Sequence, residues 1–157
     1  MKTAHRQAAR AKPQRRYAAN PAAVMLAIWR RQEYTPEELV RLKLPIRAAY
    51  DELKAGRGTQ QHWADLSVAV NTALIRAESI HPLVEQTAIQ ARDALVRMRD
   101  RYMRTGRWGF DGPGIGEVLA GVELHEELLD NSTPQQMLQA GREARKREEE
   151  QVRGGMQ

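Results

Sequence analysis

The chain has 157 residues, enough for one domain with a buried core and too few for a second independent one. It contains no cysteine, which excludes disulfides, zinc–thiolate sites and thiol nucleophiles, and the apolar run at residues 24–29 is too short to cross a bilayer. The net charge is +5, yet residues 1–32 alone carry +8 with no Asp or Glu, so the remaining 125 residues are net acidic at −3.

The first element is a basic arm at residues 1–19, which has small, basic and polar side chains and almost nothing apolar to bury. Such a segment cannot offset the entropy of ordering, so we expect it to be disordered. Its cations could neutralise phosphates and its aromatic residue could stack on a base; a solubilising tail, a contact with an acidic protein surface and an Arg-rich transit peptide are the alternatives. The candidate nucleic-acid-binding residues are Lys2, Arg6, Arg10, Lys12, Arg15, Arg16 and Tyr17.

Two helices are predicted next. Asn20 and Pro21 favour the start of a short helix that reaches residue 31. The run TPEE at residues 35–38 is typical of a capping box and predicts a helix from residue 36 onward. Pro45 lacks a backbone donor, so we expect a kink or break near residues 43–44 before the helix resumes and ends at Gly56 and Gly58.

Two long helices follow. Thr59 caps the first, whose apolar positions from Trp63 to Ile80 recur every three or four residues and form one buried face. The second covers residues 83–104, and its apolar positions from Val84 to Tyr102 alternate in spacing between four and three. This seam is typical of a coiled coil, so it could pair within the chain or across a homodimer.

A glycine-rich stretch at residues 106–116 lacks the features of a phosphate-binding loop, and its two aromatic residues could close the end of the core or anchor a partner. The arginines before it could track phosphates. Alternatively, the six acids between residues 108 and 141 could neutralise them within the fold. The candidate partner-binding residues are Arg97, Arg101, Arg104, Arg107, Trp108 and Phe110.

The last two helices are predicted at residues 115–131 and from residue 134 onward, the second after a repeat of the capping signature at Thr133. Its apolar face ends at residue 144. The fold class is therefore predicted as all-α: a compact bundle of about five helices at residues 20–144, with the disordered basic arm at 1–19 and a charged, frayed tail at 145–157.

No arrangement of side chains indicates catalysis. The four histidines lack metal-ligand spacing, and the paired carboxylates fall on helix faces expected to be exposed. We therefore expect a non-enzymatic protein without cofactor or metal, located in the cytoplasm and not in a membrane.

Four motifs resemble a loose group of small uncharacterised helical proteins encoded by phages and prophages of proteobacteria: LPIRAAYDEL at residues 44–53, GTQQHW at 58–63, GRWGF at 106–110 and STPQQM at 132–137. The resemblance implies a phage or prophage setting and carries no site residues. The leading hypothesis is an accessory protein that contacts DNA or RNA through the basic arm. The alternatives are an inhibitor or modulator that binds a host protein complex, such as a defence system, and a virion or assembly component.

Overall fold

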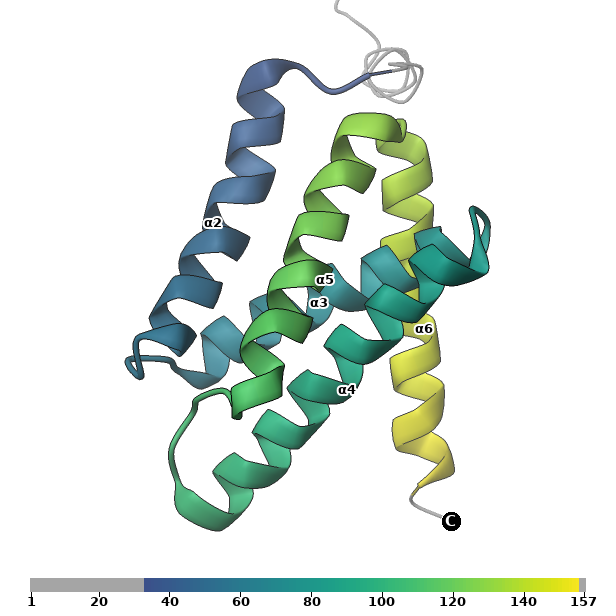
Figure 1. The fold of residues 1–157 in the computed structure, drawn as a ribbon. Coiled ribbons are helices and arrows are strands. Elements are labelled where there is room, and N and C mark those ends of the chain that lie inside the picture. Colours follow the sequence, from purple (N-terminus) through teal and green to yellow (C-terminus); the bar gives the residue numbers. More distant parts are fainter. Residues whose placement is uncertain (1–32, 156–157) are drawn as a thin grey trace, which may run out of the picture.

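The computed structural model describes residues 33–155 of the chain, and the arm and the short helix expected at residues 20–31 lie outside this range. The described part is all-α, as predicted, and its five helices pack closely against one another (Figure 1). The helices are α2 (Pro36–Lys54), α3 (Gln60–Glu78), α4 (Pro82–Thr105), α5 (Gly112–Asn131) and α6 (Pro134–Gly154).

Three of these helices begin where their capping residues predict. Thr35, Thr59 and Thr133 each accept a hydrogen bond from the backbone N–H three residues on, and each of these third residues returns a side-chain bond to the threonine amide. These reciprocal bonds satisfy two backbone donors that have no partner inside the helix. Local sequence alone therefore sets the start of three of the five described helices.

Helix α2 differs from its prediction, because it runs unbroken through Pro45. The side chains on either side of the proline are both tied to α5: Lys43 contacts Asp130 at 2.6 Å and Arg47 contacts Glu126 at 2.6 Å. Contacts with a second helix thus hold both halves of α2 in line where the local sequence favours a break.

The core lies among α2, α3, α4 and α5, where most of the fully buried side chains gather. The predicted seam of α4 is part of it, since Ala88, Ala91, Leu95 and Met98 are buried within the chain. The seam therefore packs within this chain and is not left exposed for a homodimer. A smaller cluster, centred on Met137, joins α3, α5 and α6.

The glycine-rich stretch is shorter than expected, because α5 already begins at Gly112. Asp111 provides the N-cap, and its side chain accepts a hydrogen bond of 2.7 Å from the Gly114 amide. Ile115, the first residue of the predicted helix, is exposed. The glycines and the proline of this first turn favour a loop prediction, although the helix already begins there after the aspartate cap.

Helix α6 also extends further than expected, since residues 145–154 continue the helix in place of a frayed tail. This stretch is charged on most sides and is supported by ion pairs one turn apart, such as Lys146 with Glu150 and Glu149 with Arg153. Arg147 adds a contact to Glu78 of α3 at 2.6 Å. Charge pairing, not an apolar face, sustains this end of α6.

Candidate functional site

The arginine-rich end of α4 is largely engaged within the fold. Arg97 donates to Asp111 at 2.9 Å and also to Glu117, and these bonds raise the pKa of its guanidinium and lower the pKa of the Asp111 carboxyl. Arg101 donates to the backbone carbonyl of Phe110 at 2.9 Å. Two of the candidate partner-binding arginines therefore fasten the start of α5 and the preceding loop to α4.

Trp108 and Phe110 pack onto the core. The Trp108 ring stacks on Tyr102 with ring centroids 4.1 Å apart and on Trp63 at 5.6 Å. The Trp63 indole N–H donates to the Leu95 carbonyl at 2.9 Å, and Phe110 contacts the Tyr50 ring with centroids 5.3 Å apart. This geometry matches the first of the two roles considered from the sequence, an aromatic plug that closes one end of the bundle.

Arg104 and Arg107 have a different environment from the other two candidate arginines. Both are exposed, and neither guanidinium has a hydrogen bond or ion pair to any of residues 33–155. They leave positive charge on the surface at the end of α4. The six candidate partner-binding residues therefore do not form one site.

The acidic side of α5 is neutralised from two directions, one of which the sequence analysis missed. Asp111 and Glu117 bind Arg97 of α4, in line with the expectation that acids after residue 108 neutralise the arginines of α4 within the fold. Glu126 and Asp130 instead bind Arg47 and Lys43 of α2. The sequence did contain a signal for these pairs. The two cations are four residues apart, and so are the two carboxylates, so each set shares one helix face.

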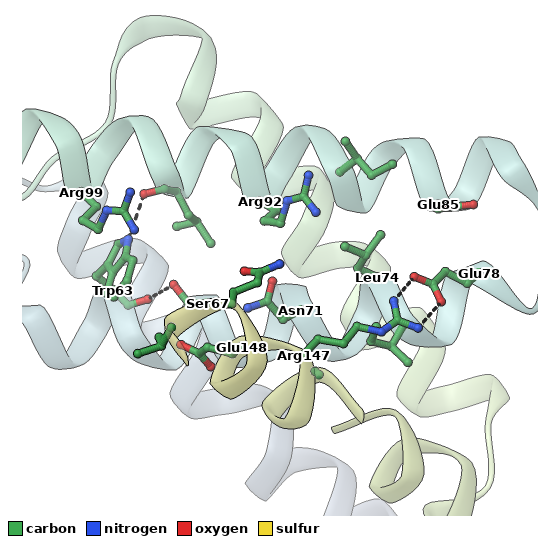
Figure 2. A pocket seen from close by; sticks show the side chains of 16 residues that line it. Trp63, Ser67, Asn71, Leu74, Glu78, Glu85, Arg92, Arg99, Arg147 and Glu148 are labelled. Carbon is green, nitrogen blue, oxygen red and sulfur yellow. Dashed lines mark hydrogen bonds and ion pairs between the residues drawn. The ribbon is translucent and has the colours of Figure 1, made fainter. Parts of the chain in front are cut away.

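An open groove of about 480 Å³ lies between α3, α4 and α6 (Figure 2). Helix α3 forms its floor, and α4 and α6 form its two walls. Ile89 contributes apolar surface, whereas Arg147 extends across the groove to its ion pair with Glu78 of α3. The groove could not be foreseen while α6 was expected to end at residue 144, since one wall consists of residues 144–152.

His125 of α5 is buried, with only 8% of its surface exposed, and its Nδ1 has no hydrogen-bond partner among the described residues. Burial disfavours the charged imidazolium and lowers the pKa of His125 to about 4. The side chain is therefore neutral at neutral pH. It is a core residue, unlike the turn and surface histidines at 81 and 62.

This lowered pKa predicts a loss of stability in mild acid. An unfolded chain binds the proton near pH 6.5 and the folded chain only near pH 4, so the stabilisation is complete above pH 6.5 and declines as the pH falls toward 4. The melting temperature of the protein should fall across this window, and that of His125→Leu should fall less. Parallel curves for the two proteins would contradict the prediction.

Within residues 33–155 no cluster of three or more histidine and carboxylate side chains could hold a metal ion. None of the helices there combines the length and apolar character of a membrane span. Comparison with known proteins gives no match to a family model, to a curated protein or to a solved structure.

Proposed function

We propose that the protein is a non-enzymatic nucleic-acid-binding protein that contacts the phosphate backbone of DNA or RNA through its basic N-terminal arm. The arm residues Lys2 to Tyr17 lie outside the described part of the chain, so the support comes from the charges of the bundle. The proposed setting, a phage or prophage protein acting in the host cytoplasm, rests on the resemblance alone.

The observation that carries the proposal is that four carboxylates of α5 and its N-cap already have cationic partners within the bundle. Asp111, Glu117, Glu126 and Asp130 each bind a cation of α2 or α4 at 2.9 Å or less. A carboxylate that left such a pair for a cation of the arm would give up a short, charge-assisted hydrogen bond. The +8 of residues 1–32 is therefore not matched by these carboxylates and remains available to an external polyanion.

Binding of this kind is expected to be electrostatic and insensitive to base sequence. The six cations of residues 1–16 would displace counterions from the phosphates, and each contact contributes about −0.9 to the slope of log affinity against log salt on duplex DNA. We therefore expect a slope of about −5 for the full chain if each of the six cations contacts a phosphate. Phosphate contacts fix position without reading sequence, so random and defined duplexes should bind alike.

Deletion of residues 1–19 tests the proposal. Fluorescence anisotropy with a labelled duplex and a labelled single strand should show affinity reduced at least tenfold at about 0.1 M salt, with most of the salt dependence lost. The matched control replaces two exposed bundle arginines that have no ion pair with a described residue, Arg104→Gln and Arg107→Gln. It should change the salt slope by no more than two phosphate contacts would contribute. Unchanged affinity in the truncated protein would overturn the proposal, as would an equal loss in the control.

The rival function, binding to a host protein complex, is less well supported by the geometry. It relied on the bundle surface and on Trp108 and Phe110 as anchors, and both rings pack against core residues. An interface hot spot needs an aromatic side chain that is free to enter a partner's pocket. No observation on the described residues favours a virion or assembly component.

A further inference from the structure

Residues 22–29 form an apolar run whose partner is not among the contacts of the five described helices. The sequence there, AAVMLAIW, is eight consecutive apolar residues between the polar arm and α2. A helix that is apolar on all sides has to be buried, because water would otherwise contact large side chains such as Leu26, Ile28 and Trp29. The sequence therefore calls for a surface that can cover this run.

The groove between α4 and α6 offers such a surface (Figure 2). Ile75 of its floor and Ile89 of one wall are only partly buried and contribute apolar side chains. On the other wall Val152 is 59% exposed, although it faces the same hollow. Exposed apolar surface of this kind gains stability when another apolar side chain covers it.

Two further hollows lie between this groove and the point where the described chain begins. Glu33 and Gln136 line one hollow, between the start of α2 and the start of α6. Gln136 also lines a second hollow, together with Ile75 and Ala140. Ile75 in turn lines the groove itself, so the three hollows share residues in sequence along one side of α6.

The connecting chain is long enough to follow this path. From Gln136 to Ala144, where the groove begins on α6, the helix rises about 12 Å over eight residues. Residues 30–33, when extended, span about 13 Å. The apolar run therefore comes within reach of the groove without any displacement of α2.

We propose that residues 22–29 of the same chain bind in the groove formed by α3, α4 and α6. The docked run completes the apolar surface of the bundle and fixes the base of the basic arm on this face. The inference does not depend on nucleic-acid binding, because it concerns apolar contacts of a segment that follows the arm.

Disulfide trapping tests the proposal cleanly, because the natural chain has no cysteine. Val24, Leu26 or Ile28 is replaced by cysteine, one at a time, in a chain that also carries Ile89→Cys. A disulfide needs the two Cα atoms within about 7 Å, so mild oxidation of dilute protein should give an intrachain bond for at least one pair. Electrophoresis without reductant would show it as a faster-migrating monomer.

The control pairs the same three cysteines with Val40→Cys. Val40 is 60% exposed on α2, does not line the groove and is much nearer in sequence, so an unbound segment would react with it more readily than with residue 89. Preferential bonding to residue 89 is the expected result. Preferential bonding to residue 40, or no intrachain bond at 89, would overturn the proposal, and a disulfide-linked dimer would assign the groove to a second copy instead.

Hydrogen exchange gives a second readout that uses the chain without cysteines. The amides of residues 22–29 should exchange slowly in the full protein, and Val152→Glu should accelerate them at least tenfold by placing a charge in the groove. Val40→Glu, at an equally exposed position outside the groove, should leave them unchanged. Fast exchange in the unmodified protein, or equal effects of the two glutamates, would reject docking.

Discussion

Replacement of Trp108 by alanine should lower the free energy of unfolding by about 3 kcal/mol, in the lower part of the range for loss of a large aromatic side chain, because the ring is half-buried. The ring lies between Tyr102 and Trp63, so its removal breaks two stacking contacts and opens the end of the core. Urea denaturation followed by circular dichroism measures the effect as a shift of the midpoint.

Two further variants separate a structural role of Trp108 from a role in partner binding. Trp108→Phe keeps an aromatic ring in the stack, so it should lower the free energy of unfolding by less than half as much as Trp108→Ala. Arg107→Ala, at the adjacent exposed position, should change stability by no more than about 0.5 kcal/mol. If Trp108→Ala proved as harmless as Arg107→Ala, the ring would not be a structural plug, and its role as a binding anchor would have to be reconsidered.

The parts of the fold that were predicted correctly depend on short-range chemistry. Thr35 and Thr133 each start a helix through bonds to residues three positions away, and this information is present in four consecutive residues. The apolar periodicity of α4 likewise identified its buried face, including Ala91 and Met98. Both signals act within a single helix, and neither requires knowledge of its neighbours.

The predictions that failed depend on contacts between distant residues. Pro45 lies inside a continuous helix because Lys43 and Arg47 are held by α5, about 80 residues further along the chain. The end of α6 was misjudged for a similar reason, since Arg147 reaches back to Glu78. Charge spacing contained part of this information, but it identifies compatible partners without showing which helices lie side by side.

The groove was beyond sequence reasoning for a related reason. It exists because α6 extends past α3 while α4 lies on the other side, so its shape is set by the angles between three helices (Figure 2). Helix crossing angles follow from how side-chain ridges fit together, and small residues determine how closely two helices approach. One such close approach involves a glycine of α5, and it leads to a second prediction with a large effect.

Gly121 and Gly116 of α5 should respond to the same substitution in opposite directions. A Cβ atom on Gly121 would overlap the Cβ of Ala91 on α4, closer than packed carbon atoms tolerate, whereas its distance of 3.4 Å from Val70 is an ordinary contact. Gly121→Ala should therefore force α4 and α5 apart and destabilise the protein by about 2 kcal/mol, even after its gain in helix propensity.

Gly116→Ala is the matched control, because a Cβ at that position meets nothing within 4 Å. It should stabilise the protein by up to about 1 kcal/mol through helix propensity alone. The two alanines thus differ by about 3 kcal/mol on one helix, which urea midpoints resolve easily. If Gly121→Ala were as stabilising as Gly116→Ala, α4 and α5 would not be packed as closely as the structure describes.

A double-mutant cycle identifies the clash itself. Ala91→Gly removes the atom that the new methyl group would meet, but it weakens α4 by about 1 kcal/mol when introduced alone. In a chain that also carries Gly121→Ala, Ala91→Gly should lower the free energy of unfolding by less than this amount or even raise it, because the methyl group of residue 121 then occupies the vacated space. A coupling energy of at least about 1 kcal/mol is expected for residues in direct contact, whereas strictly additive effects would place the strain elsewhere in the helix pair.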